Sequence, residues 1–217
     1  MKMKKITALL IAAALLVGVS ACGDKPNTDN PSDVTTSGDA SDVTTSGDSS
    51  DDTTAGTKSD VPSDPIEFLG KVWDSYSDDD KFPAAGGLGD GNIVDSAPGK
   101  MELDGETLNW KFSFPTDSVD KLDAVASLTH MLNENTFSSA AFHLKDAADA
   151  EAIAQALRDG IQARRWMCGF PDKLIVVTVD STVVAAFGLE DLINTFRDKL
   201  VSVYPDASIN FDEPIQA

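Results

Sequence analysis

The sequence predicts an α+β fold for residues 65–217: a small antiparallel sheet with ferredoxin-like β-α-β-β-α-(β) order, together with N-terminal helices. Two observations lead to this prediction. Residues 173–180 and 182–187 are rich in β-branched and apolar side chains and are separated by a turn candidate, which is typical of a hairpin buried on both faces. The segments on either side of this hairpin carry apolar residues at helical spacing. Strands and helices are therefore expected to share one domain.

The first 21 residues have the pattern of a secretory signal peptide. Lys2, Lys4 and Lys5 precede an uncharged run of 16 residues, 6–21, which is short for a helix that crosses a membrane. The run ends in small residues directly before Cys22, which is the lipobox pattern of bacterial lipoproteins. We expect cleavage before Cys22 and a diacylglyceryl group on its thiol, because two acyl chains give stable anchoring. The alternatives are a plain secretory signal and a retained transmembrane helix.

Residues 22–64 are predicted to form a disordered tether rich in Ser, Thr and Asp. The segment 32–39 (SDVTTSGD) recurs at 41–48, and a decayed third copy follows at 50–56. Each repeat offers a single valine at most, so the tract cannot bury enough apolar surface to fold. As a flexible chain of about 42 residues it would span roughly 35 Å. The sequence therefore predicts a spacer between the anchor and the domain.

The N-terminal part of the domain begins with a predicted helix. Asp64 is a good N-cap, and Pro65 suits the first helical position. Residues 81–100 follow and are rich in Gly and Pro. They lack the flanking strand, helix and lysine of a phosphate-binding loop, and the ligand spacing of a calcium loop. We interpret them as a long surface loop.

Two more elements are predicted before residue 136. Alternating large apolar residues predict a strand over residues 107–113. The apolar spacing over residues 117–133 predicts a second N-terminal helix. Together with the helix that starts at residue 65, this second helix is expected to cover one face of the sheet.

The C-terminal half supplies the predicted β-α-β-β-α-(β) order. A strand over 136–144 is followed by a helix capped by Asp146, and then by the hairpin described above. A last helix starts within 188–191, and a short edge strand is predicted over 207–211. This order is that of a split βαβ unit. Its two helices are expected to lie on the same face, opposite the N-terminal helices.

The charge balance excludes one class of partner. The whole chain has a net charge of −19, and from Pro65 onward 12 Lys and Arg stand against 26 Asp and Glu. Affinity for nucleic acids comes mainly from Lys and Arg contacts to phosphates, so we expect no nucleic-acid partner. The same acidity would repel the domain from anionic lipid headgroups.

The titratable side chains that catalysis or metal binding would use are few. With Cys22 lipidated, Cys168 has no intramolecular partner, and its apolar neighbours predict a buried thiol; activation by the nearby arginines is the alternative. His130 and His143 are the two histidines, and neither is close in sequence to a catalytic partner. A zinc site would need more ligands. We therefore expect no catalytic residues, no metal and no cofactor.

One basic and aromatic cluster lies in this acidic domain: Arg164, Arg165, Trp166 and Phe170. Arg and Trp are common at interaction hot spots, so the cluster is a candidate binding surface. In the alternative interpretation, the two aromatic rings close the end of the core and the arginines complement a helix C-terminus.

The region 117–204 resembles a family of uncharacterised bacterial lipoproteins, found mainly in Gram-positive anaerobes and described only as a domain of unknown function. The resemblance lies in a helix ending at 131–133, an alanine-rich helix start at 145–150, the Arg164-Arg165 pair, Phe170-Pro171, and a strand, hairpin and helix at the end. Some similar proteins carry the label of bacteriocin-transport accessory protein. That role belongs to thioredoxin-like proteins with paired cysteines, which this chain lacks.

The leading hypothesis is an extracytoplasmic lipoprotein, held at the cell membrane by lipid on Cys22, whose domain binds an unknown protein or small ligand without catalysis. It rests on the combination of an anchor, a spacer and a small domain without a catalytic set. The alternatives are an accessory factor of an export system and a hydrolase without a recognisable motif. A concave pocket that collects His130 or His143 with carboxylates would favour the hydrolase.

Overall fold

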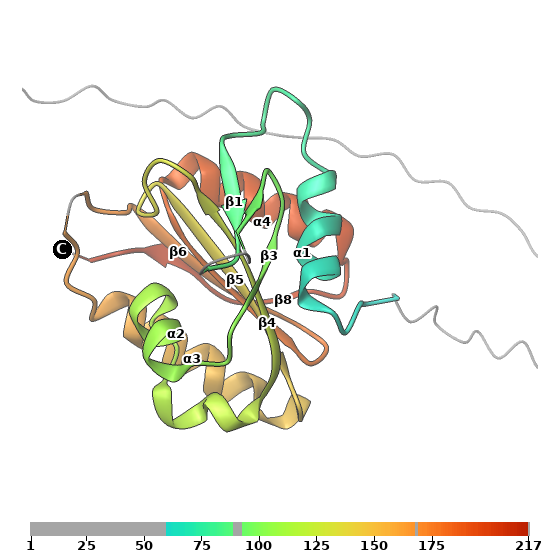
Figure 1. Cartoon of the computed structure of the whole chain (residues 1–217), viewed down its shortest axis with the longest axis vertical. Helices are drawn as coiled ribbons and strands as arrows, with labels where there is room; N and C mark the ends of the chain where they lie inside the picture. Colours follow the sequence, from blue (N-terminus) through green and yellow to red (C-terminus); the bar gives the residue numbers. More distant parts are fainter. Residues whose placement is uncertain (1–59, 89–92, 168, 217) are drawn as a thin grey trace, which may run out of the picture. The chain divides into compact units, whose positions relative to one another are not determined.

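The structure is a computed structural model that describes residues 60–88, 93–167 and 169–216. These residues form a fold of mixed helices and strands, as predicted, around an eight-stranded antiparallel sheet with the order β2-β1-β4-β5-β7-β6-β8, in which β3 also pairs with β4 (Figure 1). The strands are β1 (Ala84–Gly86), β2 (Val94–Asp95), β3 (Gly99–Met101), β4 (Leu122–His130), β5 (Phe137–Leu144), β6 (Lys173–Val179), β7 (Thr182–Gly188) and β8 (Ser208–Pro214). The sheet is larger than the small sheet that was predicted.

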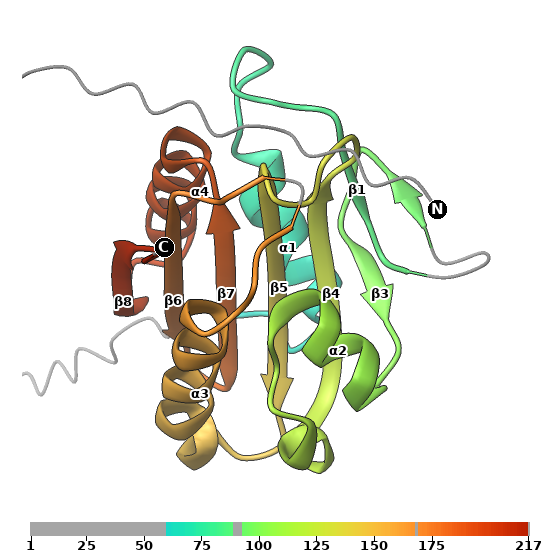
Figure 2. The ribbon, with the colours of Figure 1, turned by 90° about the vertical axis from the view of Figure 1, so that its left-hand side faces the viewer.

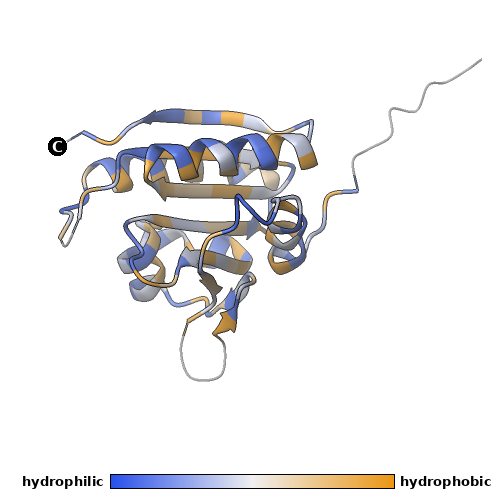
Figure 3. Ribbon diagram, turned by 90° about the horizontal axis from the view of Figure 1, so that it is seen from above, coloured by the Kyte–Doolittle hydropathy of each residue, from blue (hydrophilic) through white to orange (hydrophobic). Residues whose placement is uncertain are grey.

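Helices cover both faces of this sheet. Figure 2 shows α2 (Gly105–Phe112) and α3 (Ala150–Gln162) in front of the strands, and α1 (Pro65–Asp74) and α4 (Glu190–Val203) behind them. Two 3₁₀ helices, η1 (Thr116–Lys121) and η2 (Ala147–Asp149), lead into β4 and α3. The helices alternate between hydrophilic and hydrophobic residues, whereas the central strands are mainly hydrophobic (Figure 3). This pattern is typical of a sheet that is buried on both sides.

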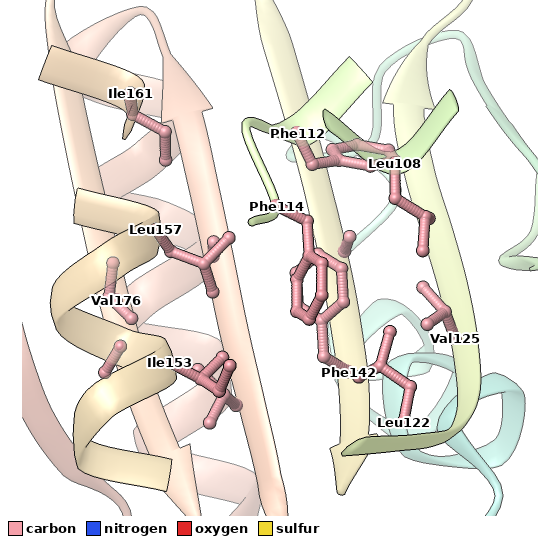
Figure 4. Packing of buried hydrophobic residues seen from close by; sticks show 14 of the residues in the cluster. Leu108, Phe112, Phe114, Leu122, Val125, Phe142, Ile153, Leu157, Ile161 and Val176 are labelled. Atoms are coloured by element: carbon pink, nitrogen blue, oxygen red, sulfur yellow. The ribbon is translucent and has the colours of Figure 1, made fainter. Parts of the chain in front are cut away.

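Each face of the sheet has its own hydrophobic core. In front, α3 presents Ile153, Leu157 and Ile161 to the strands, and Phe114 stacks on Phe142 at a ring-centroid distance of 4.8 Å (Figure 4). Behind, α1 and α4 pack together on the strands; this core contains Phe68, Leu69, Val72, Trp73, Ile193, Phe196, Leu200 and Tyr204. Alternate residues of β6 and β7 point into the two cores, which explains why these strands have no polar side, as predicted.

The element order from β5 to β8 is as predicted, but the ferredoxin-like arrangement is not confirmed. In that arrangement the last strand pairs with the first strand of the motif, whereas here β8 pairs with β6 and β4 occupies the place beside β5. The connections β5-α3-β6 and β7-α4-β8 both advance towards the β8 edge, and they start from antiparallel strands. Crossovers of the usual right hand must then place α3 and α4 on opposite faces. The prediction that both cover one face was therefore wrong.

The predicted strand at 107–113 is a helix. Asp104 caps α2 by accepting a hydrogen bond from the Thr107 amide at 2.9 Å, and Ser113 ends it in the left-handed conformation. Leu108 and Phe112, four residues apart, reach the core together, while Trp110 points to solvent. The alternating apolar residues therefore suggested a strand, although the N-cap Asp104 just before them marks the start of a short helix.

The predicted helix at 117–133 is also wrong, because most of this segment forms η1 and the nine-residue strand β4. Residues 125–128 are all buried, since β4 lies within the sheet with helices on both sides. A strand covered on both faces shows no alternation, so its apolar residues at 122, 125 and 126 imitated helical spacing.

The remaining predicted elements are confirmed in type. Asp64 caps α1, β5 and the β6–β7 hairpin occupy the expected segments, and α3, α4 and β8 follow in order. The segment 81–100 differs from a plain surface loop, because it contributes β1, β2 and part of β3.

Several sequence-based predictions fall on residues that the structure does not describe. The signal segment, Cys22, the tether up to residue 59, and Cys168 all lie outside the described residues. Among the described residues, no helix is both long enough and apolar enough to cross a membrane.

Candidate functional site

A cleft of about 520 Å³ lies where the C-terminal ends of α2 and α3 meet the turn between β4 and β5. Its size is in the range of small-ligand and peptide-anchor sites. Its lining combines two indoles, two guanidinium groups, one carboxylate and several amide and hydroxyl groups: Asn109, Trp110, Ser113, Glu134, Asn135, Gly160, Arg164, Arg165, Trp166 and Met167.

The floor of the cleft is formed by a close approach of two helices. Ser113, the left-handed C-cap of α2, packs against Gly160 of α3. A Cβ atom at Gly160 would lie 2.8 Å from the Ser113 carbonyl oxygen, so a larger residue would push the helices apart. Asn109 fixes the chain beyond the cap by donating a hydrogen bond from Nδ2 to the Phe114 carbonyl at 3.0 Å. The floor is therefore rigid.

Arg164 joins the two helices across the cleft. Its Nη1 donates a hydrogen bond to the Lys111 carbonyl at the C-terminal end of α2, over 2.8 Å. The guanidinium also lies over the Trp166 ring at 4.8 Å and over the Phe187 ring at 5.6 Å. Burial lowers the pKa of Arg164, and the nearby Glu134 carboxylate opposes this effect. Arg164 is thus a half-buried cation with a structural contact, complementing α2 rather than its own helix.

The cluster was interpreted either as a binding surface or as aromatic rings that close the core, and Trp166 and Phe170 differ in this respect. Trp166 is half-buried and packs on Phe187 of the core at a centroid distance of 5.0 Å, while also lining the cleft. Its Nε1 is buried and has no hydrogen-bond partner among the described residues. Phe170 contacts the Trp166 ring edge-on at 6.4 Å but remains 44% exposed. Only Trp166 closes the core, and Phe170 stays at the surface.

An ion pair between a buried lysine and a half-exposed glutamate lies beside both this cleft and a second, smaller cavity. Lys111 is 6% exposed, and its Nζ contacts a carboxylate oxygen of Glu134. Glu134 lines both spaces, and the second cavity of about 200 Å³ also contains Lys111 and His130. The two cavities are therefore neighbours beside the β4–β5 turn, with Glu134 in the wall of each.

Neither histidine has the contacts of a catalytic base. The Nδ1 of His130 accepts hydrogen bonds from the backbone amides of Leu132 and Asn133, at 3.2 and 3.4 Å, and its ring stacks on Phe82. His143 lies on β5, where Nδ1 is 3.1 Å from the Thr182 hydroxyl. His130 thus braces the β4–β5 turn, and His143 is a hydrogen-bonded strand residue.

Asn135 connects the β4–β5 turn to the chain that follows α3. Its Nδ2 donates to the carbonyl oxygens of Met167, at 2.9 Å, and Gly169, at 3.1 Å. The β4–β5 turn is also tied to the start of α4, because the Leu189 amide donates to the Thr136 carbonyl at 2.9 Å. Three connections far apart in the sequence therefore form one braced end of the sheet, the upper end in Figure 2.

The structure brings together three of the four predicted surface residues. Arg164, Arg165 and Trp166 line the cleft, and Phe170 lies beside it. The residues that sequence reasoning missed are Asn109, Trp110, Ser113, Glu134, Asn135, Gly160 and Met167. Most of them lie on or beside α2, which was predicted as a strand, or in the β4–β5 turn, which follows a strand that was predicted as a helix. The Asp104 cap was the signal that could have revealed α2 and its outward-facing tryptophan.

The described part of the chain contains no group of three or more His, Cys, Asp or Glu side chains that could hold a metal ion. Comparison with known proteins found no family model, no curated protein and no solved structure that matches the chain. The contacts of the cleft are therefore the basis on which a function is proposed.

Proposed function

We propose that this protein is an extracytoplasmic lipoprotein, anchored to the cell membrane by lipid on Cys22, whose domain binds a ligand or partner in the cleft between α2 and α3. The sequence supports the anchor, since a lysine-rich start and an uncharged run lead directly into small residues and Cys22. The resemblance to uncharacterised lipoproteins over residues 117–204 points the same way.

The observation that carries the binding function is the composition of the cleft. Trp110, Arg165 and Met167 all line it and are exposed to solvent. Trp, Met and Arg are the residue types that concentrate in the centres of protein interfaces, where most other charged residues are depleted. Because Asn135 and Arg164 already fix the surrounding loops, little ordering entropy would be lost when a ligand binds.

A photocrosslinking experiment tests the binding function. A benzoyl-phenylalanine placed at Met167, which is 79% exposed in the cleft, should give an adduct on irradiation of intact producing cells. The matched control places it at Ile209, which is 45% exposed near the opposite end of the sheet. Adding Trp110→Ala should abolish the Met167 adduct, because it removes a wall of the cleft. Equal adducts at both positions, or none at Met167, would contradict the proposal.

A hydrolase is the second candidate, and one observation favours it. The smaller cavity collects His130 with the Glu134 carboxylate, which is the kind of pocket that such an enzyme would need. Their contacts argue against it, because Glu134 is paired with Lys111 and the His130 Nδ1 accepts two backbone hydrogen bonds. A general base needs a free nitrogen within reach of its substrate. We therefore prefer binding without catalysis.

A further inference from the structure

Resting on the proposed binding function, we propose that the partner is a polypeptide segment with large apolar side chains flanked by carboxylates, which docks on the cleft and its rim. The rim is defined as Trp110, Met131, Leu132, Met167 and Phe170. Trp110 and Met167 line the cleft, and Met131 lines the smaller cavity. Phe170 contacts the Trp166 ring, and Leu132 follows Met131 in the β4–β5 turn.

The rim is an unusual concentration of exposed apolar side chains. Leu132 is 81% exposed, Met167 79% and Trp110 65%, and they come from the β4–β5 turn, the α3–β6 connection and helix α2. Isolated exposed apolar residues are ordinary, but a braced group of them beside a cleft marks an interaction site. A segment with one or two bulky side chains could bury these groups and place an anchor in the cleft.

The charges around the cleft select an acidic partner. The two cavities are lined by Lys111, Arg164 and Arg165 against a single carboxylate, Glu134, although the domain as a whole has more than twice as many acidic as basic residues. Lys111 already neutralises Glu134. Arg165 is exposed and forms no hydrogen bond or ion pair within the described part of the chain. Carboxylates on a partner would therefore meet unbalanced positive charge.

The point where the chain enters the domain argues for a protein rather than the membrane surface. α4 starts beside the β4–β5 turn and runs to the other end of the sheet, where Tyr204 donates a hydrogen bond to the Phe68 carbonyl at 3.0 Å. The N-terminal end of α1 therefore lies at the end of the sheet away from the β4–β5 turn. Figure 1 shows α1 on the right and α2 on the left. The described chain therefore enters the domain away from the β4–β5 turn.

The net charge of the domain disfavours two other occupants. A second copy of this acidic domain would be repelled, and anionic headgroups would be repelled in the same way. A separate polypeptide with a local acidic and apolar pattern avoids both penalties, since only its docking segment approaches the basic cleft.

A peptide titration tests this inference. The chain from residue 22 onward, carrying Cys22→Ala so that no lipid interferes, is titrated with the blocked hexapeptide Asp-Asp-Phe-Leu-Asp-Asp and with its counterpart in which Lys replaces every Asp. The readout is the set of three tryptophan indole N–H signals in an NMR spectrum. The acidic peptide should shift the indole signals of Trp110 and Trp166. The signal of Trp73 should stay in place, because its Nε1 donates to the Ser96 carbonyl behind the sheet. It should bind about tenfold more tightly than the lysine peptide.

Two matched charge reversals and a lipid arm complete the test. Arg165→Glu should weaken binding of the acidic peptide by about tenfold, whereas Lys100→Glu, an equal change of charge at the exposed residue of β3, should alter it by less than about twofold. Equal affinity for both peptides, or no shift at Trp110 and Trp166, would overturn the inference. So would binding to phosphatidylglycerol vesicles that depends on Leu132 while neither peptide binds. If the Met167 crosslink forms but the peptides fail, the binding function stands and only the chemistry of the partner is wrong.

Discussion

Gly160 is the residue on which the shape of the cleft depends most. It allows α3 to pass within van der Waals contact of Ser113, so that the C-terminal ends of α2 and α3 can share one floor. Gly70, in the middle of α1, is also helical, but a Cβ atom added there would have no other atom within 4 Å. The two glycines therefore provide a matched pair that differs only in the space around them.

We predict opposite effects on stability from alanine at these two positions. Gly160→Ala should lower the free energy of unfolding by about 1–2 kcal/mol, because the clash with the Ser113 carbonyl outweighs the gain in helix propensity. Gly70→Ala should raise it by about 0.5–1 kcal/mol, since only the propensity gain remains. Urea denaturation of both variants measures the difference. A stabilised Gly160→Ala variant would show that the two helices are not in tight contact.

At the same scale, residue chemistry predicted part of the site. Arg164, Arg165 and Trp166 could be chosen from sequence because a basic and aromatic group is rare in this acidic domain. Trp110 and Glu134 could not, since their exposure depends on the direction in which a helix and a turn present them. The role of Arg164 was also hidden, because its acceptor, the Lys111 carbonyl, is 53 residues away in the sequence.

Among the elements, β8 depends most on charge. It forms an edge of the sheet with largely exposed residues, and its carboxylates contact helices on both faces. Asp212 accepts from Lys173 and Arg197, and Glu213 accepts from Arg158 Nε at 2.6 Å and from Gln162. The hydrogen bond from Arg158 lowers the pKa of Glu213, against the opposing effect of partial burial. Charged groups at an edge also discourage pairing with other chains.

The lowered pKa of Glu213 predicts a pH-dependent contribution to stability. Because its folded pKa lies below the unfolded value, the contribution is complete above the ordinary pKa of a glutamate, about 4.3, and is lost as the pH falls through the folded pKa. The difference in melting temperature between wild type and Glu213→Gln should therefore be positive near pH 7 and shrink towards pH 3. A constant difference for Glu213→Gln would contradict this role.

Whether an element was predicted correctly depended on whether it is buried on one face or on both. Helices with one apolar stripe, such as α3 and α4, were predicted correctly because their 3.6-residue period survives in the sequence. β4 was mistaken for a helix because burial on both faces removes the two-residue period. In α2, a helix of eight residues was too short for its period to outweigh a chance alternation.

At the scale of the whole molecule, the direction of the two crossovers determines the layers. Both advance towards β8, so α3 lies on one face and α4 on the other; α2 joins α3 on its face, and α1 joins α4. The cleft forms beside the β4–β5 turn at one end of the sheet, and the described chain enters the domain at the other. Hydrophobic pattern alone could not predict this, because strand order depends on pairings between distant segments.

An anchored binding domain requires lipid on Cys22, and labelling with palmitate measures it directly. Cells that produce the chain are grown with labelled palmitate, and the protein is isolated from the membrane fraction. Wild type and Cys168→Ala should carry the label and sediment with membranes, whereas Cys22→Ala should carry none and be released. Label that persists in Cys22→Ala, or that disappears in Cys168→Ala, would contradict the anchor and with it the proposed function.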